Sequence, residues 1–287
     1  MKRLLTFLLL LIPTTSMINA QSYKSANYGD LWSKVEKALK KGLPQTAVKY
    51  LDELEALATK ADDGLELLVV CETKLDQLRE YNWKEAGPYY STVDRQRSII
   101  LGDLNGSIAK YSDHPRVLRL HYDKLLEEKR DIDRRREKSS ADYLAFKSRC
   151  QEILKGHSSK DYYYDNVDQI VKEMDSEELS DYIDGYKQQY APNQDVAIRI
   201  HTRNLSRVTL DIYRLNDNCF WEEGYRFGLF NLKRISSKVF TRTYDLPNEY
   251  NILSEKFDTI PCREVGNYVF HFHSGKHNSY SDICVSS

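Results

Sequence analysis

The hydrophobic residues of this 287-residue chain change their spacing at Tyr190-Ala-Pro192, and that change limits the folds open to it. Before this point, apolar residues recur every three or four positions, which is the spacing of one face of an α-helix. After it, apolar and polar residues alternate, which is the pattern of a half-buried β-strand. The sequence therefore predicts an α+β protein with more than one domain, in which a helical part precedes a β part.

Residues 29–187 carry the helical spacing. A first helix over 31–39 is expected to end at Gly42, and Pro44 suits the first turn of a second helix. Because each helix can bury its apolar stripe only against the other, we expect a helical hairpin. Further helices are expected over 65–78, 93–108 and 117–125, with a break at Gly87-Pro88. The helix-turn-helix lengths resemble tetratricopeptide stacking, without a clean repeat of about 34 residues.

The β part begins after a linker at 190–194. The candidate strands are 196–200, 208–212, 239–244, 257–260, 268–273 and 283–285. Several short strands separated by polar loops predict an antiparallel β-sandwich. Its core is expected to hold the alternating apolar residues Ile198, Ile200, Leu210, Ile212, Phe270 and Phe272. The predicted domains are therefore a leader at 1–20, a helical domain at 21–189 and a sandwich at 190–287.

The amino terminus has the pattern of a secretory signal peptide. Lys2 and Arg3 precede an apolar core from 4 to 12, and small polar residues follow up to a cut expected at Ala20-Gln21. The apolar core is far shorter than the ~20 residues that span a bilayer, and no later apolar run is long enough either. We therefore expect an exported product, periplasmic or extracellular, with no membrane span.

The charge balance argues against a nucleic-acid partner. Without Lys2 and Arg3, the chain keeps 40 basic residues against 43 acidic ones, a formal charge of −3. A nucleic-acid-binding protein needs a basic face that displaces counterions from phosphates.

Five cysteines are spread widely over the chain, at 71, 150, 219, 262 and 284. No two of them form a Cys-x-x-Cys pair, and the odd count leaves at least one thiol without an internal disulfide partner. We interpret them as buried, reduced residues that pack as small apolar groups. The alternative is a single bridge within the β part, from Cys262 to Cys284.

Motifs of catalysis are absent from the sequence. It contains no His-Glu-x-x-His, no phosphate-binding glycine loop and no nucleophile elbow. The acidic pairs Asp62-Asp63 and Glu177-Glu178 are interpreted as loop charges or as first-turn helix charges that favour the helix dipole. No catalytic, cofactor-binding or metal-ligating residue is predicted, so the chain is expected not to be an enzyme and to need no cofactor.

One histidine group supports an alternative. His271 and His273 lie two positions apart on one face of a predicted strand, and His277 follows. Two such imidazoles can ligate a metal ion with a third ligand, which the sequence does not identify. The alternative function is a metal-dependent enzyme or accessory protein of the cell envelope that uses His271, His273 and His277. The competing interpretation is that these histidines face solvent, opposite a core stripe of Tyr268, Phe270 and Phe272.

Two further segments have a plain and a functional interpretation. Residues 129–138 include Arg134-Arg135-Arg136, yet acidic residues interleave with the basic ones, so a solvated helix face is favoured over a patch for an acidic partner. Tyr162-Tyr163-Tyr164 is interpreted as helix packing with hydrated hydroxyls, and the alternative is a cluster that stacks on a ligand.

Three stretches resemble the amino-terminal region of bacterial alpha-2-macroglobulin family proteins. Residues 31–53 resemble the first helical hairpin of these proteins, and 196–214 resemble the paired opening strands of their first macroglobulin domain. Residues 260–270, with Pro261 and Gly266 around a turn, resemble the closing pattern of that domain. The resemblance implies a macroglobulin-like fold for the β part, and residues 82–160 contribute nothing to it.

The same resemblance implies a function related to peptidase inhibition. Complete members of the family bind proteases, carry a cleavable bait segment and often form a thioester between a Cys and a Gln three residues later. None of the five cysteines here is followed by such a Gln, and we expect no bait segment. The resemblance therefore implies an exported, non-enzymatic binding or structural protein with a protein partner, a peptidase being the candidate, or else a truncated remnant of a larger protein.

Overall fold

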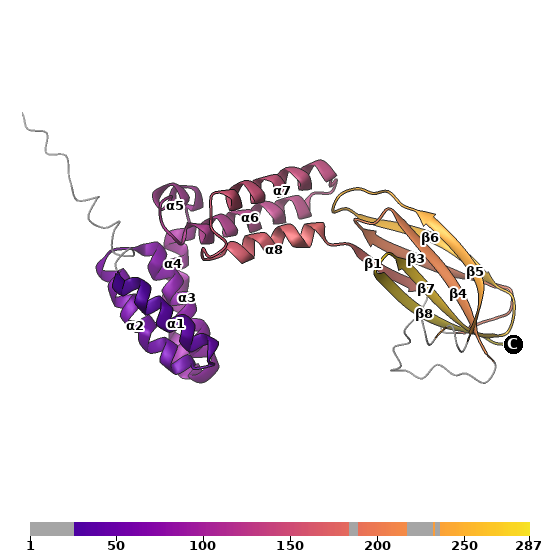
Figure 1. Cartoon of the computed structure of the whole chain (residues 1–287), viewed down its shortest axis with the longest axis horizontal. Coiled ribbons are helices and arrows are strands. Elements are labelled where there is room, and N and C mark those ends of the chain that lie inside the picture. Colours follow the sequence, from indigo (N-terminus) through magenta and orange to yellow (C-terminus); the bar gives the residue numbers. More distant parts are fainter. Residues whose placement is uncertain (1–25, 184–188, 217–231, 233–235) are drawn as a thin grey trace, which may run out of the picture. The chain divides into compact units, whose positions relative to one another are not determined.

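The computed structural model describes residues 26–183, 189–216, 232 and 236–287, and the expected leader at 1–20 lies outside these ranges. Within the described ranges, eight helices precede eight strands, which confirms the α+β class (Figure 1). The chain divides into two compact units. One holds the residues up to Glu127 together with His157–Asn166, and the other holds Glu128–Gly156 together with Val167–Ser287.

Helical hairpins build the first unit. Its helices are α1 (Ala26–Lys40), α2 (Pro44–Lys60), α3 (Gly64–Tyr81), α4 (Trp83–Leu101) and α5 (Leu104–Lys110). The expected first hairpin is confirmed: Gly42 adopts a φ of 64° after α1, and Pro44 opens α2. A left-handed residue followed by a proline ends one helix and starts the next at little steric cost. The hairpin buries Leu31, Val35, Ala38, Leu51 and Leu54.

The expected boundaries around α4 were wrong in two places. Pro88 does not break the pattern, because it lies inside α4, whose first turn is capped by Asn82 accepting from the backbone N–H of Glu85. In the second turn, proline forgoes one backbone hydrogen bond, and the helix continues past it. The predicted helix over 93–108 is instead divided after Gly102, where Asp103 caps α5 by accepting from the N–H of Gly106.

Three more helices follow. They are α6 (Val117–Arg134), which crosses the division between the units, α7 (Ser140–Lys155) and α8 (Tyr164–Asp175). Ser139 caps α7 by accepting from the N–H of Asp142. Among the described residues, none of the helices combines the length and apolar content needed to cross a bilayer.

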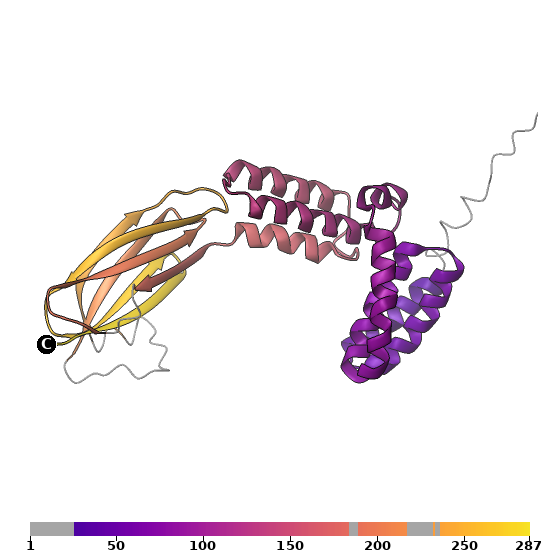
Figure 2. The ribbon, with the colours of Figure 1, turned by 180° about the vertical axis from the view of Figure 1, so that it is seen from behind.

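The strands form two sheets. They are β1 (Glu178–Ile183), β2 (Gln189–Tyr190), β3 (Gln194–Arg203), β4 (Arg207–Leu215), β5 (Ser236–Asp245), β6 (Leu253–Cys262), β7 (Gly266–Ser274) and β8 (His277–Val285). One sheet has the order β1-β3-β6 and the other β2-β8-β7-β4-β5. All neighbours are antiparallel except the short β2–β8 pair. The strands form one group in both views (Figures 1 and 2).

The first strand corrects the expected extent of the helices. Residues 178–183 were expected to be helical but form β1, which pairs along β3 from Glu178↔Arg203 to Ile183↔Ile198. Leu179 and Ile183 share one face of the strand and pack against the core of the β part. A short segment of this kind gains a full ladder of backbone bonds only when a partner strand is present, so local spacing did not reveal it.

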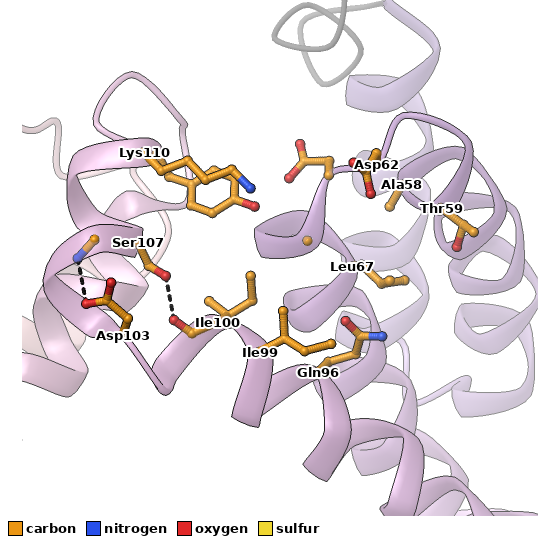
Figure 3. A pocket seen from close by; sticks show the side chains of 14 residues that line it. Ala58, Thr59, Asp62, Leu67, Gln96, Ile99, Ile100, Asp103, Ser107 and Lys110 are labelled. Atoms are coloured by element: carbon orange, nitrogen blue, oxygen red, sulfur yellow. Dashed lines mark hydrogen bonds between the residues drawn. The ribbon is translucent and has the colours of Figure 1, made fainter. Parts of the chain in front are cut away.

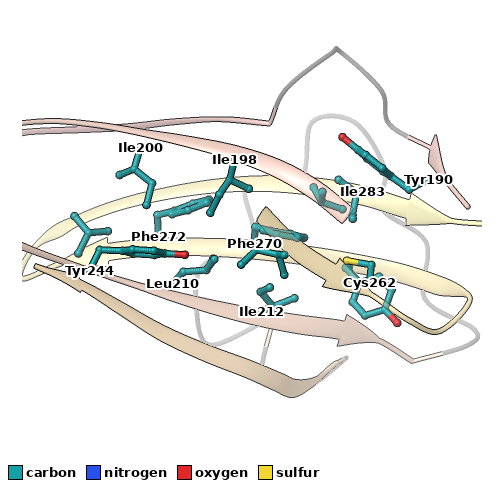
Figure 4. Close-up of a cluster of buried hydrophobic side chains, with 14 of the residues drawn as sticks. Tyr190, Ile198, Ile200, Leu210, Ile212, Tyr244, Cys262, Phe270, Phe272 and Ile283 are labelled. Atoms are coloured by element: carbon teal, nitrogen blue, oxygen red, sulfur yellow. The ribbon is translucent and has the colours of Figure 1, made fainter. Parts of the chain in front are cut away.

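One apolar core lies between the two sheets. All six residues expected there are at most 2% exposed, namely Ile198, Ile200, Leu210, Ile212, Phe270 and Phe272. The close-up shows these side chains converging from both sheets, with Tyr244 and Ile283 beside them (Figure 4). The prediction that alternation would direct them into a shared core is therefore confirmed.

Candidate functional site

The outer face of the five-stranded sheet brings polar side chains from four strands together. Asp211 on β4 and His271 on β7 are register partners. Thr241 on β5 and Tyr280 on β8 extend the same row on either side. His273 lies in the next row along β7. Because side chains alternate along a strand, these residues lie on the face opposite the core.

Asp211 is a carboxylate that is only 8% exposed. Its Oδ1 accepts a hydrogen bond from Thr241 Oγ1 at 2.7 Å and lies 3.4 Å from Lys238 Nζ, while its Oδ2 lies 3.3 Å from His273 Nε2. Burial alone would raise the pKa of Asp211, but the hydrogen bond from Thr241 and the positive charge of Lys238 outweigh burial and hold that pKa below its ordinary value. Asp211 is therefore ionised at neutral pH.

His271 is held in one orientation by its neighbours. Its ring stacks on Tyr280 with centroids 4.5 Å apart and on His273 with centroids 4.7 Å apart. Its Nε2 lies 2.8 Å from Asn278 Oδ1, and Asn278 Nδ2 donates to the carbonyl of Lys276. That second bond orients the amide, so Asn278 Oδ1 is the acceptor and His271 Nε2 the donor. In this tautomer, the lone pair of the imidazole lies on Nδ1.

The structure changes the membership of the predicted histidine group. Asp211, His271 and His273 each place one nitrogen or oxygen atom within 4.8 Å of the others. His277 is not in this group, because its Nε2 lies 2.9 Å from Glu177 Oε2. The third member, Asp211, comes from a different strand, and the sequence did not identify it.

The expectation that the histidines face solvent was wrong for His271, which is 2% exposed. A second apolar cluster covers the adjoining part of the outer face; it consists of Tyr213, Leu215, Leu232 and Val269, with Tyr280 packed against it. Tyr213 and Tyr280 on the outer face therefore help to bury the outward-facing residues of β7, although these lie opposite the main core.

The first unit contains a groove with a volume of about 570 Å³ (Figure 3). The turn between α2 and α3 forms one wall, and α4 and α5 form the other. Leu67, Ile99 and Ile100 give it apolar surface, and Ile99 is 63% exposed. Asp62 and Lys110 lie on opposite sides of the opening (Figure 3). The groove therefore offers an apolar strip with charged margins.

A buried ionic network lies behind the turn that forms this groove. Asp63 caps α3, because its Oδ1 accepts from the N–H of Glu66 at 3.1 Å, and its Oδ2 lies 3.0 Å from His114 Nε2. The N–H of Arg116 donates to His114 Nδ1, so Nε2 carries the proton that His114 shares with Asp63. Burial opposes the ionisation of Asp63, but the contacts with His114 outweigh it, and the pKa of Asp63 lies below its ordinary value.

Glu66 is the most deeply buried member of the network, at 1% exposure. Its Oε1 accepts from Trp32 Nε1 at 2.6 Å, and Arg116 Nε lies 3.5 Å from its Oε2. Burial dominates here and raises the pKa of Glu66. The Arg116 guanidinium lies over the rings of Trp32, at 4.4 Å, and Tyr162, at 4.5 Å.

Two residues of the run Tyr162-Tyr163-Tyr164 pack against arginines in or beside this network. Tyr162 packs on Arg116 and Tyr163 packs on Arg119, and the two tyrosine rings contact each other. The packing part of the interpretation is therefore confirmed for Tyr162 and Tyr163, whose rings lie on arginine side chains just before α8 begins at Tyr164. Sequence reasoning missed the network itself; the helix-start pattern Asp63-x-x-Glu66 could have identified only the cap of α3.

The charged residues of 129–138 form ion pairs with one another and with neighbouring residues. Lys129 forms an ion pair with Asp133 at 2.9 Å, and Arg135 forms one with Asp142 at 2.8 Å. Such exposed pairs contribute little stability and fit a solvated surface. The acidic pairs were expected to be loop charges or first-turn helix charges. Asp63 is instead the N-cap of α3, directly before its first turn, and Glu178 begins β1.

The four described cysteines are free thiols. Cys71, Cys150 and Cys262 are buried, as expected, and Cys284 is half-buried. The alternative of a Cys262–Cys284 bridge was wrong. Cys284 alternates with the core residues Ile283 and Val285, so it points to the outer face of β8, whereas Cys262 belongs to the core. Cys219 lies outside the described ranges.

Comparisons with known proteins assign no family to the chain: no family model matches it, and no curated protein matches it.

Proposed function

We propose that this chain is an exported, non-enzymatic binding protein that resembles the amino-terminal part of bacterial alpha-2-macroglobulin-type peptidase inhibitors. One observation carries the proposal: helical hairpins are followed by two sheets around a single apolar core, in the order that the resemblance implies. In this proposal, the helical part is a tetratricopeptide-like array and the β part is a macroglobulin-like sandwich. A protein partner, with a peptidase as the candidate, binds to the surface of the chain.

The groove of the first unit is the surface that fits such a partner best. Its exposed Ile99 offers apolar contact area, Asp62 and Asp103 add negative charge to its margin, and Lys110 adds a positive charge. An apolar centre with a polar margin is the usual anatomy of a protein-binding surface. A partner segment with an apolar residue beside a basic one would complement it.

Two of the acidic groups around the groove, Asp63 and Asp103, support binding rather than catalysis. Asp63 caps α3 and contacts His114, and Asp103 caps α5. A general base has to reach a proton on a substrate, and both of these carboxylates already accept bonds that hold helix ends together.

The test is to mix the purified chain with a panel of peptidases. Complex formation is measured by size-exclusion chromatography with light scattering, and cleavage is measured on a large protein substrate and a small peptide substrate. A surface-acting inhibitor slows cleavage of the large substrate more than that of the small one. If both substrates are cleaved at the full rate and no complex forms, the inhibitory role is refuted.

A variant pair locates the binding surface. Ile99→Glu places a charge in the groove, whereas Leu144→Glu makes the same change at an exposed position of α7, where Leu144 is 48% exposed. We expect the first variant to weaken the complex and the second to leave it unchanged. Equal effects of the two variants would exclude the groove.

A further inference from the structure

We propose that Asp211, His271 and His273 form a binding site for a divalent transition-metal ion, with zinc as the best match. The three residues come from β4 and β7 and lie on the outer face of the five-stranded sheet. This inference is independent of the peptidase proposal, because it concerns a different face and a different unit from the groove.

The donor set suits this class of metal. Two imidazoles and one carboxylate are the ligands of many zinc sites that keep an open coordination position, and of related iron sites. Magnesium and calcium prefer sites built from oxygen atoms alone, so the two histidines disfavour them. Asp211 supplies the carboxylate, and its Oδ2 lies 3.3 Å from Nε2 of His273.

The distances are close to what a tetrahedral ion requires. Two ligand atoms bound to zinc at the usual distance lie about 3.3 Å apart. Asp211 Oδ2 and His273 Nε2 are already 3.3 Å apart. All three candidate atoms lie within 4.8 Å of one another, so a rotation of His273 that brings them together has to close at most about 1.5 Å. The side chain of His273 is 33% exposed and has room for that rotation.

The surrounding residues hold the ligands as a metal site requires. Histidine ligands usually donate their second ring N–H to a fixed acceptor, which sets the tautomer. Asn278 Oδ1 accepts from His271 Nε2, and Asn278 is itself fixed by the Lys276 carbonyl. Thr241 donates to Asp211 Oδ1 and leaves Oδ2 directed toward His273.

Lys238 is the competing cation. Its Nζ lies 3.4 Å from Asp211 Oδ1, and its side chain is 49% exposed. An ammonium group on a half-exposed side chain can move into solvent when a metal ion takes the carboxylate. Lys238→Met is therefore expected to raise the affinity for the metal ion, because it removes a positive charge that repels the ion and competes with it for Asp211.

The experiment is a calorimetric titration of the purified chain with Zn²⁺, followed by Co²⁺ substitution read by visible absorption. We expect one equivalent of Zn²⁺ to bind, and Asp211→Asn and His273→Asn each to weaken the affinity at least about 10-fold. Asn278→Ala is expected to weaken it by about 10–100-fold, because it frees the orientation of His271. A melting curve followed by circular dichroism confirms that each variant is folded.

Two matched controls remove an imidazole that contacts a carboxylate elsewhere. His277→Asn removes the partner of Glu177, and His201→Asn removes the partner of Glu255, whose Oε1 lies 2.8 Å from His201 Nε2. Both are expected to bind Zn²⁺ as the unmodified chain does. The proposal is overturned if the chain binds Zn²⁺ no more tightly than about 1 mM, or if folded Asp211→Asn and His273→Asn bind it with unchanged affinity.

Discussion

Replacing Asp63 by alanine tests whether the buried ionic network holds the helical unit together. The substitution removes two things at once, the cap of α3 and the carboxylate that contacts His114. Asp103→Ala is the matched control, because Asp103 caps α5 through the same bond to the third residue but is exposed. The difference between the two variants therefore reports the net effect of the buried contacts of Asp63, which are the bond with His114 and the repulsion from Glu66.

The magnitudes follow from the contacts. Loss of an aspartate cap costs about 1 kcal/mol of unfolding free energy. A buried hydrogen bond to a charged group adds about 1.5–3 kcal/mol. The side chains of Asp63 and His114 are 6% and 3% exposed, so solvent screens their contact little. Asp63→Ala is expected to cost about 2.5–4 kcal/mol and Asp103→Ala about 1 kcal/mol or less.

The assay is urea unfolding followed by the helical circular-dichroism signal, with hydrogen exchange of the α3 amides to assign the loss to this unit. The midpoint should shift while the slope stays constant, since the exposed surface of the unfolded chain is unchanged. If the two variants lose the same free energy, the buried contacts of Asp63 contribute no net stability, and the reasoning about the network is refuted.

The pH dependence has a defined sign. Because the pKa of Asp63 is lowered in the fold, its contribution is present above its unfolded pKa of about 3.9 and disappears as the pH falls through the folded value. The stability difference between the unmodified chain and Asp63→Ala is therefore expected to shrink as the solution is acidified below about pH 4. A difference that stays constant to strongly acid pH would contradict the assignment.

Three further outcomes are expected. Glu66 has a raised pKa in the fold, so its ionised form costs stability as the pH rises above its unfolded pKa of about 4.3. Glu66→Gln keeps an acceptor for the Trp32 N–H, so it should destabilise the chain at neutral pH less than Glu66→Ala does. Chemical unfolding measures the difference. By the same measurement, Phe270→Ala should lower the free energy of unfolding by about 3–5 kcal/mol. Leu253→Ala, at a position that is 60% exposed, should change it by about 0.5 kcal/mol or less. Equal effects of the two variants would disprove the shared core. Thiol labelling of the native chain should modify Cys284 before Cys150 and Cys262. Burial raises the pKa of Cys150 and the pKa of Cys262 to about 11, which keeps these two thiols protonated. Preferential labelling of Cys262 would contradict its place in the core.

The sequence alone was sufficient wherever near neighbours in the chain decide the structure. Gly42 and Pro44 mark the turn between α1 and α2, because glycine permits the positive φ found there and proline fixes its own φ at a value that suits the start of a helix. Alternation along β3, β4 and β7 was sufficient to identify the six residues of the shared core, because successive side chains of a strand point to opposite faces.

The tertiary structure decided what depends on distant partners. Asp211 and His273 are 62 positions apart, and Asp63 and His114 are 51 apart, so only strand register and helix packing bring each pair together. The strand β1 exists because β3 offers it a ladder, and His271 is buried because aromatic side chains cover the outer face of its sheet. Local spacing records which face of an element is apolar, whereas the partner of that face is selected by packing across the whole chain.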